Sequence, residues 1–433
     1  MNILIVGNGG REHTIAHQVY NSPSFANNES RLFCTIGNPG INKIAEPVNI
    51  KPTSIEELLK FVIENKIDFT IVGPEIPLSL GIVDLFEKNG LKIFGPSKKA
   101  AEIETSKVFS KDFMNRYDVP TAKSKSFTSS GLNEALKFAE KLGYPVVLKA
   151  DGLAAGKGVI IIGNSPELEK TLKDFTVNKI FGKSGINFLI EEYLTGYELS
   201  VFVITDGIDY IILPASQDHK KIGENDTGKN TGGMGAYAPA DFLIDKSLYD
   251  IIRNKIIEPT IKGLNKEGRK YKGCLYCGLM ISTDSTGKKI PFVIEFNCRF
   301  GDPETQAVLP LIKSDFLDLL LSVVENRVSE YQLILNKNHS CCVVLASNGY
   351  PDKYETGKSI QGLNEVNDDC LIFHSGTTSK GSEIITNGGR VLSVVGLSEL
   401  SLKNAIENSY LNVDKISFKN KYFRKDIARK GLI

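Results

Sequence analysis

Residues 146–158 read Val-Val-Leu-Lys-Ala-Asp-Gly-Leu-Ala-Ala-Gly-Lys-Gly. The apolar run that ends at Lys149 predicts a β-strand, and Gly152, Gly156 and Gly158 predict a loop directly after it. Because glycine has no Cβ and tolerates positive φ, the backbone amides of such a loop can approach a polyphosphate closely. This part of the sequence is therefore interpreted as a phosphate-binding loop.

Two lysines support this interpretation, because Lys149 precedes the loop and Lys157 lies inside it. Two ammonium groups can thus reach the same anion. The spacing is not that of a P-loop, since Gly152 and Gly156 enclose three residues instead of four and a glycine follows the lysine. A glycine-rich hairpin with solvated lysines is the alternative interpretation.

A later strand carries polar residues that suit a nucleoside. Glu191 and Glu192, followed by Tyr193 and Leu194, close an apolar run, and Glu198 comes shortly afterwards. The edge of such a strand can offer backbone groups to adenine, and a carboxylate there can accept hydrogen bonds from ribose hydroxyl groups. We therefore expect the adenosine part of a nucleotide at this edge.

Residues 291–299 alternate with a period of two. The period places Phe292, Ile294, Phe296 and Cys298 on one face of a strand and Glu295, Asn297 and Arg299 on the other. The Glu295 carboxylate and the Asn297 amide carbonyl are hard oxygen donors of the kind that bind Mg²⁺ together with nucleotide phosphates. Arg299 beside them can hold a phosphate during its transfer. A polar face that is merely solvated is the alternative.

Residues 1–104 predict a small doubly wound domain with a parallel sheet. A strand at residues 2–6 leads through a turn containing Gly9 and Gly10 into a helix, an arrangement that can bind phosphate with its amides. A nicotinamide-binding motif is disfavoured, because Glu12 stands where its third glycine is required and no acidic ribose partner ends the second strand. A purely structural turn remains the alternative.

Glu75 follows another predicted strand, at residues 69–72, within the sequence Gly-Pro-Glu-Ile-Pro. We expect this loop at the carboxyl edge of the sheet, where open α/β folds bind ligands. Glu75 is therefore expected either to meet ribose hydroxyl groups or to cap the next helix.

Composition narrows the functional class. The 433 residues, 41% of them hydrophobic, are enough for three or four domains. The net charge of +1, without a basic tract, argues against nucleic acid as a partner. No leader segment is recognisable, and the apolar stretch at residues 316–324 is shorter than the ~20 residues that span a bilayer, so we expect a cytoplasmic protein without membrane contact.

The cysteine content also indicates a cytoplasmic protein. Seven cysteines, an odd number, fit a reducing compartment better than a disulfide framework. Cys274 and Cys277 are expected on opposite sides of one strand, which disfavours a zinc or redox pair.

The order of the motifs resembles that of ATP-grasp ligases: a strand ending in lysine, a glycine loop, Glu-Glu-Tyr-Leu and a Glu-Phe-Asn strand. Four further segments are similar to one branch, the phosphoribosylamine–glycine ligase family. They are Gly-Asn-Gly-Gly-Arg-Glu-His at residues 7–13, Ser-Gln-Asp-His-Lys at 216–220, Asn-Thr-Gly-Gly-Met-Gly at 230–235 and Arg-Phe-Gly-Asp-Pro-Glu at 299–304. The resemblance covers nearly the whole chain.

This resemblance implies α/β and α+β domains in a fixed order. They are an N-terminal Rossmann-like domain with a doubly wound parallel sheet (residues 1–104), an ATP-grasp domain (105–327) with a mobile lid at about 120–193, and a small C-terminal α+β domain (328–433). Some members carry fused synthetase and transformylase units for which this chain has no room, so we expect a monofunctional monomer.

The resemblance also implies a ligase of purine biosynthesis. Such an enzyme uses ATP and Mg²⁺ or Mn²⁺ to join glycine to 5-phosphoribosylamine through a glycyl phosphate. Another ATP-grasp carboxylate–amine ligase with a different acceptor is the main alternative. A nucleotide-binding regulatory protein without turnover is a second one.

Family positions imply roles for individual residues. ATP is expected at Lys107, Lys149, Gly152, Gly156, Lys157, Gly158, Glu191, Glu192, Leu194 and Glu198, and the metal ion at Glu295 and Asn297. The substrates are expected at Gly9, Gly10, Glu75, Asp218, His219, Lys220 and Arg299. Arg299, Lys149 and Asp218 are the expected catalytic residues. Lys107 can also be a surface lysine, and His219 is either a base or, as for most loop histidines, a structural group.

Overall fold

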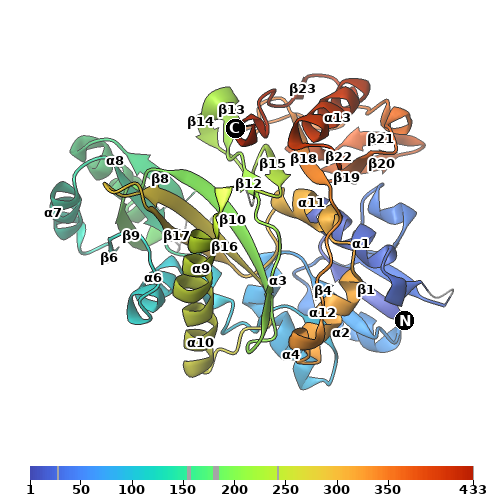
Figure 1. Cartoon of the computed structure of the whole chain (residues 1–433), viewed down its shortest axis with the longest axis horizontal. Coiled ribbons are helices and arrows are strands. Elements are labelled where there is room, and N and C mark those ends of the chain that lie inside the picture. The colour runs from blue at the N-terminus through green and yellow to red at the C-terminus, as the bar shows by residue number, and fades with distance from the viewer. Residues whose placement is uncertain (27–28, 154–157, 179–184, 241–242, 433) are drawn as a thin grey trace.

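The structure is a computed structural model that describes residues 1–26, 29–153, 158–178, 185–240 and 243–432. Four larger sheets organise these residues, and they confirm the expected mixture of α/β and α+β domains (Figure 1). Gly156 and Lys157 of the expected phosphate loop lie outside the described residues. In the described part of the chain, the helices are all too short or too polar to cross a membrane.

The N-terminal domain is a parallel sheet that is buried on both faces. Its strands are β1 (Asn2–Val6), β2 (Arg31–Thr35), β3 (Glu46–Val48), β4 (Phe69–Val72) and β5 (Ile93–Phe94), in the order β3-β2-β1-β4-β5. Its helices are α1 (Gly10–Tyr20), α2 (Ile55–Glu64), α3 (Glu75–Leu80) and α4 (Ile82–Lys88). Along β1, Ile3 and Ile5 join one hydrophobic cluster and Leu4 and Val6 another. Since β1 pairs with β4, the turns that follow these two strands adjoin at the carboxyl edge.

The central sheet is antiparallel and carries the motif strand at residues 291–299. Its strands are β10 (Tyr197–Thr205), β11 (Tyr210–Ile212), β16 (Gly273–Thr283) and β17 (Lys289–Asn297), in the order β11-β10-β16-β17. Helices α9 (Lys246–Ile251) and α10 (Glu258–Lys266) lie along it (Figure 1). Helix α6 (Lys107–Arg116) leads from the N-terminal domain to the lid.

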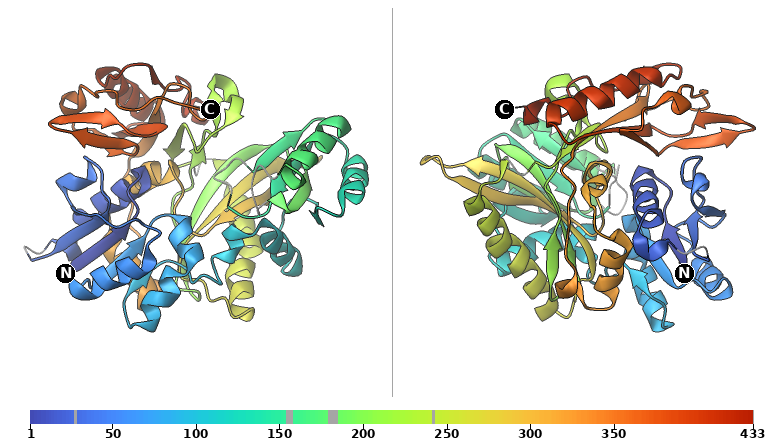
Figure 2. Two further views of the ribbon diagram at one scale, coloured as in Figure 1. Left: turned by 180° about the vertical axis from the view of Figure 1, so that it is seen from behind. Right: turned by 45° about the vertical axis from the view of Figure 1, so that its right-hand side comes forward.

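The lid is a four-stranded sheet with two helices that projects from the rest of the molecule (Figures 1 and 2). It consists of β6 (Ser124–Thr128), α7 (Leu132–Leu142), β7 (Val146–Ala150), β8 (Val159–Ile162), α8 (Ser165–Thr176) and β9 (Asn187–Glu192), with the strand order β6-β9-β7-β8. Phe127, Leu148, Phe175 and Phe188 belong to its own hydrophobic core, which is distinct from the two clusters of the main body. This separate core allows the lid to move as a unit.

The C-terminal sheet includes two strands, β12 (Gln217–Asp218) and β15 (Gly235–Ala238), that precede the C-terminal domain in the sequence by about a hundred residues. Its members are β12, β15, β18 (His339–Ser347), β22 (Arg390–Ser398) and β19 (Cys370–His374), with β23 (Lys421–Tyr422) beside β18 and α13 (Leu402–Lys415) packed on the sheet. Between β12 and β15, a two-stranded hairpin forms from β13 (Lys221–Gly223) and β14 (Thr227–Asn230). The segment at residues 216–235, which contains the expected substrate residues Asp218, His219 and Lys220, is therefore built into the C-terminal sheet through β12 and β15.

The C-terminal part also corrects one expectation. The family resemblance implies a hairpin at residues 387–390 of the C-terminal domain. Instead, β21 (Glu383–Thr386) pairs with β20 (Thr377–Lys380), whereas β22 pairs with β18 and β19. The glycines there connect two different sheets, so the hairpin prediction is wrong.

The separate core of the lid predicts a local response to a cavity. Replacing the fully buried Phe188 by alanine should cost about 3–5 kcal/mol of lid stability. Hydrogen exchange should show faster exchange in residues 124–192 and unchanged protection in the N-terminal sheet. Ile161→Ala is the matched control, because Ile161 lies on β8 of the same sheet and is exposed. Equal loss of protection in all domains would contradict an independent lid core.

Candidate active site

A cleft of about 560 Å³ lies where the lid, the central sheet, the N-terminal domain and the C-terminal sheet meet. Ten of the expected site residues line it: Glu75, Lys107, Lys149, Gly158, Glu191, Asp218, Lys220, Glu295, Asn297 and Arg299. The other described candidates, Gly9, Gly10, Gly152, Glu192, Leu194, Glu198 and His219, are not among its lining residues. Arg11, Glu104, Lys111, Tyr350 and Arg390 line the cleft but were not predicted from the sequence.

Strand β17 forms the floor of the cleft, and a β-bulge changes its alternation. Gly278 pairs with Glu295 whereas Leu279 pairs with Val293, so Ile294 is an extra residue in the ladder. As a result Val293 and Phe296 are buried, while Ile294 lines the cleft beside Glu295. The expected common face of Phe292, Ile294 and Phe296 is therefore wrong. Glu295, Asn297 and Arg299 line the cleft as expected, but so do Ile294 and Phe296.

Lys149 joins the lid to this floor. Its ammonium group donates a hydrogen bond to the Ile294 carbonyl oxygen at 3.0 Å, at the bulge, and forms an ion pair with Glu191 at 2.8 Å. Glu191 is almost wholly buried, and its Oε1 also pairs with the Lys111 ammonium at 3.1 Å. Burial alone would raise the pKa of Glu191, but the two lysines lower it overall. The Glu191 side chain is thus a counter-ion for Lys149.

Lys107 connects helix α6 to the start of the glycine loop. Its Nζ donates to the Gly152 carbonyl oxygen at 2.9 Å. In the same place Asp151 Oδ1 accepts hydrogen bonds from the Ser106 hydroxyl and the Val108 amide, as a carboxylate does at a helix N-terminus. Burial lowers the pKa of Lys107, an effect opposed by Glu295. Lys107, expected either at the nucleotide or at the surface, thus lies beside the start of the glycine loop.

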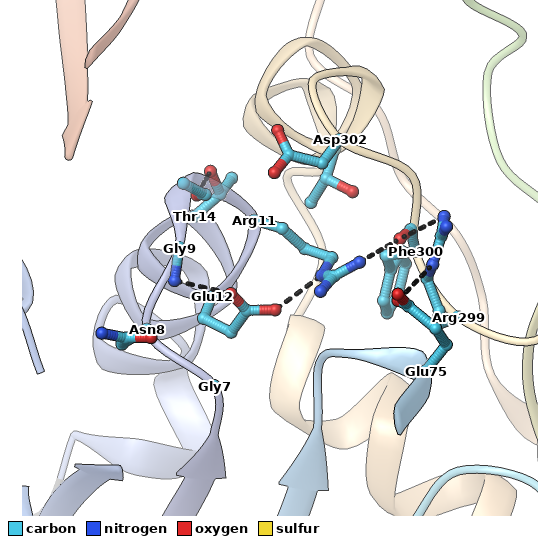
Figure 3. Close-up of polar contacts among 12 residues, drawn as sticks. Gly7, Asn8, Gly9, Arg11, Glu12, Thr14, Glu75, Arg299, Phe300 and Asp302 are labelled. Atoms are coloured by element: carbon cyan, nitrogen blue, oxygen red, sulfur yellow. Dashed lines mark hydrogen bonds and ion pairs between the residues drawn. The ribbon is translucent and has the colours of Figure 1, made fainter. Parts of the chain in front are cut away.

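Arg299 lies between two carboxylates on the N-terminal side of the cleft. Its Nε lies 3.3 Å from Glu75 Oε2 (Figure 3), and its Nη2 lies 3.2 Å from Glu104 Oε1. Glu104 Oε2 also accepts the Cys298 amide at 2.6 Å, so one carboxylate holds both the backbone and the side chain of this segment. Burial would raise the pKa of Glu75, but Arg299 and Arg11 lower it overall. Glu75 begins helix α3 and pairs with Arg299.

The glycine turn at the start of α1 is filled by the side chain of Glu12, a residue of the same helix. Glu12 Oε2 accepts the Gly9 amide at 2.7 Å, and Oε1 lies 2.6 Å from Arg11 Nε (Figure 3). A Cβ atom at Gly7 or Gly73 would overlap the Glu12 side chain. The residue that argued against a nicotinamide motif thus fills the turn, and the Gly9 amide is already paired rather than open to an anion.

Asp218 and Lys220 come from the segment shared with the C-terminal sheet. Lys220 Nζ lies 2.7 Å from Glu198 Oε2, so Glu198 is paired with a lysine instead of facing the cleft directly. Burial raises the pKa of Asp218 well above its usual value, Lys220 opposes the rise, and Glu304 adds to it. This excess of carboxylates suits a cationic amine.

His219 between them is a structural residue. It is buried, its Nε2 accepts the Ala428 amide at 3.3 Å, and it does not line the cleft. Burial and the nearby Arg424 lower its pKa to about 4, so the ring is neutral at physiological pH. Of the two interpretations left open by the sequence, the geometry favours the structural one.

Arg424, near the C-terminal end of the sequence, contacts the hairpin that follows Lys220. Its side chain is fully buried and contacts Asp226 at 3.0 Å and Asp426 at 2.7 Å. It also donates to the Lys221 carbonyl oxygen, and Asp426 accepts the Asn225 amide. The local sequence around Arg424 contains one of its partners, Asp426, but gives no sign of the contacts with Asp226 and Lys221, which lie about 200 residues away.

The donor set of the cleft fits a divalent cation that arrives with its phosphates. Among the described residues there is no cluster of three or more His, Cys, Asp or Glu side chains that could hold a metal alone. Glu295 and Asn297 both line the cleft, and Lys220, followed by Lys149 and Lys107, lowers the pKa of Glu295 against the effect of burial. A charged carboxylate and an amide oxygen, completed by phosphate oxygens, match the way Mg²⁺ binds.

The buried arginine gives a stability prediction. Arg424→Met should lower the free energy of unfolding by about 2–3 kcal/mol, because it leaves Asp426 without its cation in a mostly buried site. The difference between variant and wild type should become smaller as the pH falls from about 4 towards about 2. The pKa of Asp426 is lowered to about 2 in the folded protein, so protonation in this range removes the charge that Arg424 stabilises. Denaturant titration measures both effects. Arg429→Met, at an exposed position, is the control, and equal losses in the two variants would contradict the assignment.

Comparisons with known proteins agree with this architecture. Models of the phosphoribosylglycinamide synthetase N domain, ATP-grasp (A) domain and C domain match residues 1–104, 105–305 and 340–430. A phosphoribosylamine–glycine ligase from Caldanaerobacter subterraneus subsp. tengcongensis is 47% identical over 428 residues, which cover 99% of each chain. The crystal structure of a phosphoribosylamine–glycine ligase from Thermotoga maritima has a TM-score of 0.85 and 31% identity, covering 98% of this chain and 100% of that one.

Longer relatives contain the same unit. A bifunctional purine biosynthetic protein from Pichia angusta is 42% identical over 437 residues, which cover 100% of this chain and 54% of that protein. The chain thus spans about half the length of this relative.

Proposed function

The chain belongs to the phosphoribosylglycinamide synthetase family, and from this we propose that it is an ATP-dependent ligase that joins glycine to 5-phosphoribosylamine. The products are glycinamide ribonucleotide, ADP and phosphate, in a step of purine biosynthesis. The observation that supports this most strongly is the cleft itself, where Lys107 of α6, Lys149 of β7, and Glu295 and Arg299 of the segment at β17 converge from three different parts of the chain. We propose further that it acts as a cytoplasmic monomer.

The chemistry requires activation of a carboxylate. A carboxylate is a poor electrophile because its oxygen is a poor leaving group, and transfer of the γ-phosphoryl group from ATP to glycine gives a glycyl phosphate. The amine nitrogen of phosphoribosylamine then attacks the carbonyl carbon, the carbon–oxygen bond to phosphate breaks, and the nitrogen loses a proton. Water must be kept out while the acyl phosphate exists, which is a role for the lid.

The residues of the cleft divide this work. Lys149 and Lys107 neutralise the phosphate charge, and Arg299, held by Glu75 and Glu104, steadies the acyl phosphate. Asp218 lies near other carboxylates and its own pKa is raised. An incoming ammonium group would therefore stabilise the charged form of Asp218. The second substrate binds on the side formed by Lys220 and the C-terminal sheet, where Arg390 of β22 and Tyr350 in the turn after β18 line the cleft.

Glu295 and Asn297 are the proposed ligands of the divalent ion, Mg²⁺ or Mn²⁺. When bound, such an ion offsets the charge of the nucleotide phosphates during transfer. The bulge at Ile294 supports this role, because it interrupts the ladder directly before Glu295, where residues 294–297 all line the cleft.

An ADP-release assay tests the proposal. With ATP and Mg²⁺ present, release is expected only when glycine and freshly prepared phosphoribosylamine are supplied together, and mass spectrometry should identify glycinamide ribonucleotide. Other amino acids in place of glycine should give little release. Release that ignores the sugar amine, or that prefers another acid, would favour an ATP-grasp ligase with a different acceptor.

Variants locate this activity in the cleft. Lys149→Ala and Glu295→Ala should each lower turnover by about a hundredfold or more while the protein stays folded, because each removes a charge that faces the transferred phosphate. Lys125→Ala is the matched control, since Lys125 is an exposed lysine on β6 of the lid. Activity like that of the wild type in either variant would remove the residue from the proposed site.

A further inference from the structure

Lys111 lines the cleft but has no part in the proposed ATP site. It lies one turn after Lys107 on helix α6, and its side chain is only 3% exposed. Its Nζ pairs with Glu191 Oε1 at 3.1 Å and donates hydrogen bonds to the Thr121 hydroxyl at 2.6 Å and the Ala122 carbonyl oxygen at 3.3 Å. An ammonium group buried in this way needs such partners to offset its lost hydration.

These contacts connect three parts of the molecule. Thr121, which receives the hydrogen bond from Lys111, donates in turn to the Val293 carbonyl oxygen at 2.7 Å. Glu191 belongs to the lid strand β9, whereas Val293 belongs to the floor strand β17. Lys111 therefore holds the base of the lid against the floor from the side of helix α6.

The charge balance gives Lys111 a second effect. Glu191 carries one negative charge and is contacted by two ammonium groups, Lys149 at 2.8 Å and Lys111 at 3.1 Å. Together the three side chains have a net charge of +1 when both lysines are protonated. Without Lys111, Lys149 and Glu191 would form a closed neutral pair, and the attraction of Lys149 for a phosphate would be weaker.

We propose that Lys111 is a positioning residue for the nucleotide: by sharing the Glu191 carboxylate, it leaves the ammonium group of Lys149 available to a phosphate of ATP. This inference rests on the proposed function, which places Lys149 in the ATP site. Lys111 reaches Lys149 through the shared Glu191 carboxylate, and it reaches the floor strand through Thr121. Burial lowers the pKa of Lys111 to about 8, so the group is mostly charged at neutral pH.

A binding experiment on the full chain tests the inference without the other substrates. Lys111→Met keeps the length of the side chain and removes its charge, and it should raise the dissociation constant of ATP with Mg²⁺ at least about tenfold in calorimetry. In steady-state assays KM for ATP should rise, while KM for glycine at saturating ATP stays within about twofold of the wild-type value. A residue that acts only on general stability would lower the fraction of active enzyme, and with it the apparent kcat, but would leave both KM values unchanged.

A double-mutant cycle separates action through Glu191 from direct contact. In a Glu191→Gln background the carboxylate charge is gone, so adding Lys111→Met should weaken ATP binding by less than about threefold. Lys111→Arg, which keeps the charge, should bind ATP close to the wild-type level. Lys125→Met, on the exposed side of the lid, is the control for folding and lid stability.

Each outcome decides a different point. Unchanged ATP affinity in a folded Lys111→Met protein, or an equal loss in both backgrounds, would overturn the positioning role. If Lys111→Met does not fold, failure of the folded Lys111→Arg protein to bind ATP would also overturn it. A wild-type protein that binds ATP but releases no ADP with both substrates would overturn the proposed function alone.

Discussion

The hydrogen bond from the Lys149 ammonium group to the Ile294 carbonyl oxygen joins the two halves of the site. Lys149 belongs to a lid with its own hydrophobic core, and Ile294 is the extra residue of the bulged floor strand. A lid with a separate core can swing away, so a polar contact at its base defines where it returns. The proposed nucleotide site follows from this contact, because it brings the lysine of one unit to the carboxylate of the other.

Buried charge is the second feature on which the site depends. Glu191 lies between two lysines, and Arg299 lies between Glu75 and Glu104. Groups of this kind cost free energy to bury and add little to stability when compared with apolar residues of similar size. Their value lies in fixing cationic groups in a cleft where the charge of a phosphate will develop, at no cost of reorganisation during the reaction.

Local sequence patterns were sufficient for much of the site but not for its supports. The period of residues 291–299 placed Glu295 and Asn297 on the cleft side, whereas the bulge at Ile294 depends on the partner strand and left no mark in the period. Lys111 carries a weak signal, its spacing of four from Lys107. Arg424 carries none, because its contact with Asp226 spans a long sequence separation, as does the pairing of β15 with β18, and a local pattern does not contain such contacts.

The central claim is that the cleft between lid and floor holds a nucleotide. A crystal structure of the protein with a non-hydrolysable ATP analogue and Mg²⁺ tests it most directly. The account predicts the phosphate chain between Lys149 and the floor strand, with the metal ion bound by Glu295 and Asn297. A nucleotide bound elsewhere, or phosphates that contact neither Lys149 nor Glu295 through the metal, would contradict it.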